Sequence, residues 1–66
     1  MEIEIGKTYT NAAGKIFRTI VRRTRYEAFI YTTNRPGWEG KECSCWYKTM
    51  ENWAKHEVVV LLFLHP

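Results

Sequence analysis

Turn-forming residues divide this sequence into short runs of β-branched and aromatic residues, and almost none of these runs has helical periodicity. The clearest turn spans residues 34–40, where a Pro-Gly pair stands between Asn34 and a second glycine. Another turn spans residues 11–14 and ends on Gly14, which can adopt the positive φ that other residues resist. The pattern predicts a mainly β domain of short antiparallel strands.

Five strands are expected, at residues 7–10, 15–23, 27–33, 41–48 and 56–64. The second of these strands does not alternate cleanly between apolar and polar residues. We expect Phe17, Thr19 and Val21 to point mainly inward, with a bend or bulge that re-aims one end of the strand. The last strand is apolar without alternation, so both of its faces need cover.

One short helical turn is expected near residues 49–54, with Thr49 as its N-cap and with Met50 and Trp53 on one side. The chain has 66 residues, the length of one small domain. Such a chain buries only about 60% of the surface that its unfolded form exposes. An aromatic content of 15% supplies the large rings that a dense small core needs. We therefore expect residues 1–66 to form a single, five-stranded antiparallel SH3-like barrel.

Two short motifs resemble those of a known group of domains. Residues 6–9 read Gly-Lys-Thr-Tyr, and residues 14–17, after the first turn, read Gly-Lys-Ile-Phe. This order is similar to that of small bacterial and phage domains with an SH3-like barrel, as is the pair Met50 and Trp53 before the final strand. The resemblance covers most of residues 5–60. It implies the fold and a phage or prophage origin, and it implies no activity.

The positive charge of the chain is concentrated in its first half. The formal net charge is +3, and residues 1–27 account for all of it, because residues 28–66 hold equal numbers of basic and acidic side chains. Between Lys15 and Arg25 there are five positive charges and no negative one. This asymmetry favours an acidic partner for the second strand and the turn that follows it.

Nucleic acid is the partner that this basic segment fits best. The residues expected to contact it are Lys15, Arg18, Arg22, Arg23, Arg25 and Tyr26. Tyr31 and Trp38 are further stacking surfaces, since small barrels bind single strands with cations along the phosphates and rings under the bases. The alternative is a solvated strand face, on which arginine keeps an edge soluble.

A protein-binding module is the second hypothesis. The turn at residues 34–40 presents Arg35 and Trp38, two residue types that dominate interface hot spots, and they could dock on a host protein. The apolar residues 58–64 could pair edge to edge with a second copy in a homodimer. Trp38 could equally fold back over the mouth of the barrel.

Two cysteines raise the question of a metal site. Cys43 and Cys45, with His56 and His65, supply the atoms that zinc accepts. Structural zinc sites usually place two or more residues between their cysteines, whereas a strand would separate these two Cα atoms by about 6.6 Å. The same geometry disfavours a disulfide between them. Burial in the core is the simpler expectation, and metal ligation stays open as the alternative.

Catalytic patterns are weak in this sequence. The chain has no aspartate, and its serine, cysteine and histidine residues lack a spacing typical of nucleophilic or acid–base catalysis. The glycines form no phosphate-binding loop with the required Lys and Ser/Thr. We therefore expect a non-enzymatic binding module without a metal or cofactor.

Signals for secretion or membrane insertion are not evident. The start is acidic and has no basic region followed by an apolar stretch. The longest apolar run, residues 58–64, has seven residues, whereas a membrane-spanning helix needs about 20. Two cysteines are too few for a disulfide scaffold. These features predict a soluble cytoplasmic protein that does not enter a membrane.

Overall fold

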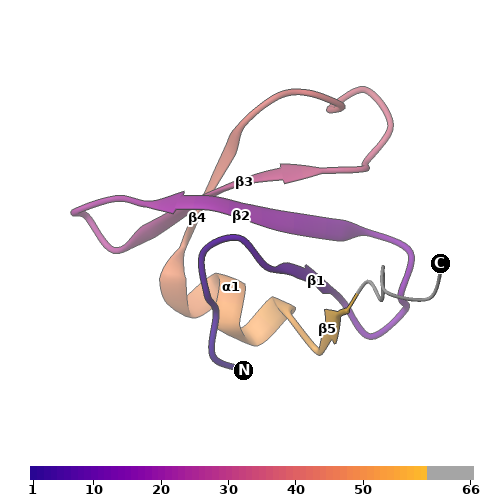
Figure 1. The fold of residues 1–66 in the computed structure, drawn as a ribbon, viewed down its shortest axis with the longest axis horizontal. Coiled ribbons are helices and arrows are strands. Elements are labelled where there is room, and N and C mark those ends of the chain that lie inside the picture. Colours follow the sequence, from indigo (N-terminus) through magenta and orange to yellow (C-terminus); the bar gives the residue numbers. More distant parts are fainter. Residues whose placement is uncertain (60–66) are drawn as a thin grey trace, which may run out of the picture.

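Five antiparallel strands and one short helix make up the fold (Figure 1). The computed structural model describes residues 1–59. The elements are β1 (Thr8–Thr10), β2 (Phe17–Arg23), β3 (Ala28–Thr33), β4 (Cys43–Trp46), α1 (Tyr47–Trp53) and β5 (His56–Val58). They confirm the mainly β class, the five strands and the single short helix between the fourth and the fifth.

The strands form one sheet with the order β4-β3-β2-β1-β5. Within residues 1–59, β4 and β5 are the two edges and do not pair with each other, so hydrogen bonds do not close the sheet into the expected barrel. In Figure 1, α1, β1 and β5 lie on one side of β2, and the long loop between β3 and β4 extends on the other. The SH3-like barrel itself stays a prediction.

Side chains from the N-terminal segment, β1, β2, β3 and the helical segment meet in one core. Tyr9 of β1, Ile20 of β2 and Met50 of α1 are its largest fully buried side chains. The cluster also contains Ile3, Phe29, Tyr31 and Ala54. The hydroxyl of Tyr9 accepts a hydrogen bond from the backbone N–H of Glu4 at 2.8 Å, which ties the N-terminal segment to β1. This tie helps to hold Ile3 against the core.

The inward face of β2 is not the one predicted. Phe17 and Val21 are exposed and Thr19 is half-buried, whereas Ile20 is fully buried and Arg18 is half-buried. The prediction failed because it counted arginine as a solvent-facing residue, although its long apolar stem can cover a core. The expected bulge is present, since the pairing of β2 with β3 shifts register between Ile20 and Arg22.

The helix begins earlier than predicted. It starts at Tyr47, and its N-cap position is Trp46, which makes no capping hydrogen bond with its side chain. Thr49 is therefore inside the helix and does not cap it. The backbone N–H of Tyr47 instead donates to the carbonyl of Glu27 at 2.8 Å, so the chain outside the helix satisfies this first donor. Met50 and Trp53 both pack on the core, as expected.

Several predictions concern β5 and the residues that follow it. His56 begins the edge strand β5, the position expected for it. Three predictions lie largely outside the described residues. They are most of the strand at residues 56–64, the homodimer contact through residues 58–64, and the role of His65.

Within residues 1–59, no helix has the length and apolar character needed to cross a membrane.

Candidate functional site

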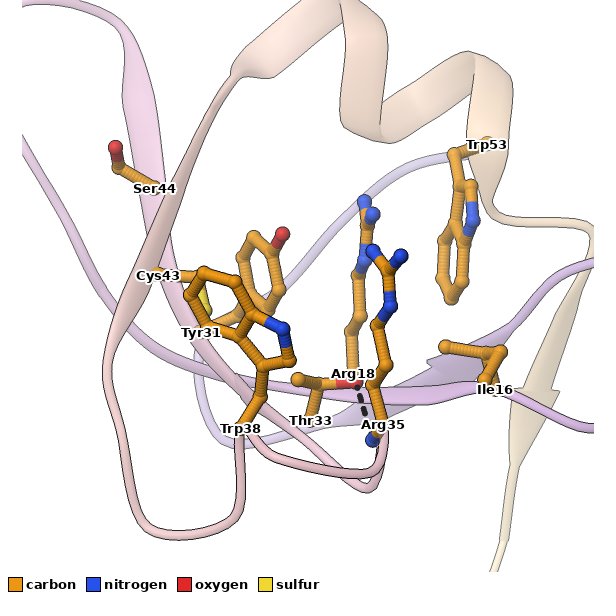
Figure 2. Close-up of a pocket in the computed structure, with 9 residues that line it drawn as sticks. All are labelled: Ile16, Arg18, Tyr31, Thr33, Arg35, Trp38, Cys43, Ser44 and Trp53. Atoms are coloured by element: carbon orange, nitrogen blue, oxygen red, sulfur yellow. Dashed lines mark hydrogen bonds between the residues drawn. The ribbon is translucent and has the colours of Figure 1, made fainter.

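A pocket of about 450 Å³ lies between the sheet, the C-terminal end of α1 and the loop that joins β3 to β4 (Figure 2). Its lining consists of Ile16, Arg18, Tyr31, Thr33, Arg35, Trp38, Cys43, Ser44 and Trp53. Two arginines and three large rings therefore meet at one place, although they come from four separate parts of the chain.

Arg18 is held between two rings. Its guanidinium carbon lies 4.1 Å from the ring centre of Trp53 and 4.5 Å from that of Tyr31. Both distances are well inside the range of about 6 Å over which a ring attracts a cation. We call this arrangement of Arg18, Tyr31 and Trp53 the arginine clamp. It fixes the position of a positive charge in the wall of the pocket.

The sheet register explains how the clamp forms. Arg18 pairs with Thr33, and Ile20 pairs with Tyr31. Because paired residues in antiparallel strands point to the same side, all four side chains share the face that carries the core. Trp53, the last residue of α1, packs against the same core and covers the guanidinium from the other side. Figure 2 shows the arginine between these two rings.

The guanidinium of Arg18 has no strong acceptor among the described residues. Its Nη1 approaches Met50 Sδ at 3.8 Å and Cys45 Sγ at 4.0 Å, and sulfur atoms are weak acceptors. None of the ion pairs within residues 1–59 involves Arg18. Since the two rings and the two sulfur atoms are its described neighbours, the remaining N–H groups are the part left for a ligand.

Arg35 and Trp38 reach the same pocket from the β3–β4 loop. The backbone N–H of Arg35 donates to Thr33 Oγ1 at 3.4 Å, and that of Trp38 donates to the Arg35 carbonyl at 3.0 Å. Gly37 between them has φ +87°, a conformation that favours glycine and lets the loop turn. In Figure 2 the guanidinium groups of Arg18 and Arg35 point the same way, between Trp38 and Trp53.

The pocket is electropositive. None of its described lining residues is acidic, and it contains two guanidinium groups that stay charged at any physiological pH. Burial raises the pKa of Tyr31 above its ordinary value, and the charge of Arg18 only partly opposes this shift. The Tyr31 hydroxyl is therefore protonated near neutral pH and is a hydrogen-bond donor. An anion is the ligand that such a lining favours.

The other residues expected to contact nucleic acid are distributed elsewhere. Lys15 lies before β2, and Arg25 and Tyr26 lie in the turn after it, at the opposite end of the strand. Arg22 forms an ion pair with Glu42 at 3.0 Å. The guanidinium of Arg23 lies 5.7 Å from the ring of Phe29, and that of Arg25 lies 5.7 Å from the ring of Tyr26.

The structure thus combines parts of two predicted sites. Arg18 belongs to the set expected to bind nucleic acid, and Arg35 and Trp38 belong to the set expected to bind protein, yet all three line one pocket. The sequence predicts Tyr31 as a stacking surface, but it places Trp53 only in the helical turn. The pairing of Arg18 with Thr33 was the missing information, because it sets which residues share a face.

The two cysteines lie on the core face of β4. Both are free and pack against the core cluster, but they are half-buried and not fully buried as the simpler expectation had it. Cys43 also lines the pocket. Within residues 1–59, no three His, Cys, Asp or Glu side chains come together as a metal site. His65, the fourth ligand considered for zinc, is outside the described residues.

Comparison of the chain with protein families, with curated proteins and with solved structures found no match.

Proposed function

We propose that the protein is a binding module without catalytic activity and that it contacts single-stranded nucleic acid through the pocket between β2, α1 and the β3–β4 loop. The observation that carries the proposal is the arginine clamp, with Arg35 beside it and no acidic side chain among the described lining residues. Small β domains that bind single strands combine cations for the phosphates with rings for the bases.

Each part of the pocket has a place in this function. Arg18 and Arg35 supply the cations, and the clamp holds Arg18 in position before a ligand arrives. Because the rings of Tyr31 and Trp53 are already covered by Arg18, base stacking falls to Trp38, whose surface is 45% exposed. A pocket of about 450 Å³ is in the range of small-ligand sites, which run from about 300 to 1,000 Å³.

Binding of a labelled oligothymidine, followed by fluorescence anisotropy at several salt concentrations, tests the proposal. If two phosphates are neutralised, the logarithm of the affinity falls against the logarithm of salt concentration with a slope of about −1.4. We expect Arg35→Gln to weaken binding by about tenfold or more, since it removes a charged hydrogen-bond donor from the phosphate.

Arg25→Gln is the matched control because it makes the same change of charge in the turn after β2, away from the pocket. It should change the affinity by no more than about twofold. Equal losses in the two variants would place the contact along the basic hairpin instead of the pocket. No binding at low salt would reject nucleic acid as the partner.

The role of Trp38 is tested by its own fluorescence. Stacking of a base on an aromatic ring contributes about 1–3 kcal/mol, so Trp38→Leu should weaken oligothymidine binding by about fivefold or more. It should also remove the quenching of tryptophan fluorescence that the oligonucleotide causes. Trp46→Leu, at an exposed tryptophan outside the pocket lining, is the control and should keep both signals. Persistence of the quenching in Trp38→Leu would show that the base stacks elsewhere.

A further inference from the structure

The two guanidinium groups of the pocket carry more positive charge than one internal phosphate of a strand can balance. A phosphodiester has a single negative charge and two free oxygens. A terminal phosphate has a charge of about −1.5 to −2 at neutral pH and three acceptor oxygens. Arg18 and Arg35 together bring two charges and present them toward the same space (Figure 2). Building on the function proposed above, we propose that the pocket recognises the terminal phosphate of a nucleic-acid strand.

The arginine clamp is suited to binding a phosphate along the N–H edge of the Arg18 guanidinium. The Arg18 guanidinium carbon lies 4.1 and 4.5 Å from the ring centres of Trp53 and Tyr31, which fix the group between them. A guanidinium that is fixed in this way offers its N–H groups in one plane, the geometry that engages two oxygens of a phosphate at once. A phosphomonoester has a third oxygen, and Arg35 is placed to bind it.

Two other described basic residues, Lys7 and Arg22, already have acidic partners. The ammonium of Lys7 lies 2.9 Å from a Glu4 carboxylate oxygen and 3.7 Å from one of Glu57. Arg22 is paired with Glu42 at 3.0 Å. These carboxylates would repel a doubly charged phosphate, whereas none of the described pocket residues would. Within residues 1–59, Arg18 and Arg35 form no such ion pair, so their charges are available to a phosphate in the pocket.

Pocket size and the position of Trp38 agree with a strand end. A volume of about 450 Å³ suits one nucleotide better than a run of several. With the phosphate at the two arginines, the first base of the strand can stack on Trp38, which is on the loop and 45% exposed. The rest of the strand then leaves the pocket past the loop and contributes little further contact.

The experiment compares four probes with the full-length protein at one salt concentration. They are an oligothymidine with a 5′-phosphate, the same strand with a 3′-phosphate, the strand with neither, and thymidine monophosphate as a competitor. We expect at least one phosphorylated strand to bind about tenfold or more tightly than the strand with neither phosphate. Thymidine monophosphate should displace it.

Arg35→Gln provides the second measurement. It should abolish the preference for the phosphorylated strand, whereas Arg25→Gln should keep the preference. Thermal unfolding of both variants shows whether each is folded under the conditions used. A preference that survives in Arg35→Gln would place the terminal phosphate outside the pocket and overturn the inference.

The outcomes separate this inference from the proposed function. Equal affinity for strands with and without a terminal phosphate overturns the inference and leaves single-strand binding intact. Binding of thymidine monophosphate without binding of any strand supports phosphate recognition and rejects the single-strand function. Failure of all four probes to bind rejects both proposals.

Discussion

Arg18 behaves both as a core side chain and as a charged group. Its stem lies on the inward face of β2 beside the fully buried Ile20, and its guanidinium is stacked between Tyr31 and Trp53. The hydrophobic pattern predicts arginine on the solvent face and therefore Phe17 and Val21 in the interior, yet both are exposed. The sequence contains no local signal that separates a stacked arginine from a solvated one, because the rings come from β3 and α1.

The clamp should contribute to stability as well as to binding. We expect Arg18→Lys to lower the free energy of unfolding by about 1 kcal/mol, because an ammonium group cannot stack flat on two rings. Urea unfolding measures the change. Arg22→Lys, at an exposed ion pair with Glu42, is the control and should change the stability by less than about 0.5 kcal/mol. Equal effects of the two substitutions would argue that the rings do not stabilise Arg18.

Tyr31 should make the protein less stable at alkaline pH. Burial raises the pKa of Tyr31 above the ordinary 10.0, with the charge of Arg18 opposing the shift in part. The unfolded chain therefore loses this proton at a lower pH than the folded protein does. The stability that depends on the neutral hydroxyl is complete below pH 10.0 and is lost as the pH rises through the folded pKa.

Urea unfolding at pH 8, 9, 10 and 11 checks this prediction. Tyr31→Phe should show a smaller loss of stability above pH 10 than the unchanged protein. Some loss should remain, because the hydrogen bond from Lys7 to Glu4 raises the pKa of Lys7 above 10.5 and acts in the same direction. Tyr26→Phe, in the exposed turn after β2, should keep the original pH profile. An unchanged profile in Tyr31→Phe would contradict the prediction.

At the scale of the elements, strand positions were more predictable than the faces that the strands bury. The runs of β-branched and aromatic residues placed all five strands, although each of the first four is shorter than expected, β4 most of all. Turn residues marked where β1, β2 and β3 end, and this information is local in the sequence. The inward face of β2, by contrast, depends on its register with β3 and on the bulge between Ile20 and Arg22. These contacts are not local.

The turn between β2 and β3 contains a residue with a strained backbone, and a substitution can relieve this strain. Glu27 has φ +60°, the left-handed conformation that residues other than glycine and asparagine resist. The backbone N–H of Thr24 donates to the Ala28 carbonyl at 2.8 Å, so the loop has three residues and Glu27 occupies its glycine-favouring last position. Left-handed backbone costs about 1–2 kcal/mol in a residue with a Cβ atom.

We expect Glu27→Asn to raise the free energy of unfolding by about 0.5–1 kcal/mol, since asparagine tolerates this conformation better. Thermal and urea unfolding measure the gain. Glu27→Ala removes the same charge but keeps a side chain that resists positive φ, so it should give no comparable gain. If both variants are equally stabilised, the effect comes from the lost carboxylate and not from the backbone.

At the scale of the whole molecule, the question is whether the overall charge or the pocket determines binding. The net charge of +3 is small, and the structure spreads its basic residues over both ends of β2 and over the loops. The charge distribution along the sequence predicted a positively charged strand, but it could not predict that Arg18 and Arg35 would line one pocket. The position of Arg35 beside Arg18 depends on where the β3–β4 loop folds back, which only the three-dimensional structure reveals.

Two double variants separate overall charge from pocket geometry. Arg18→Lys with Arg35→Lys keeps the net charge at +3 but removes both planar guanidinium groups, so we expect oligothymidine affinity to fall by about tenfold or more. Lys15→Gln with Arg25→Gln removes two charges outside the pocket lining and leaves a net charge of +1, and the affinity should fall by only about twofold to threefold. Anisotropy titrations at one salt concentration measure both. Lys15→Gln with Arg25→Gln could instead weaken binding more than Arg18→Lys with Arg35→Lys does. In that case the long-range field of the basic first half of the chain attracts the ligand, and the pocket does not select it.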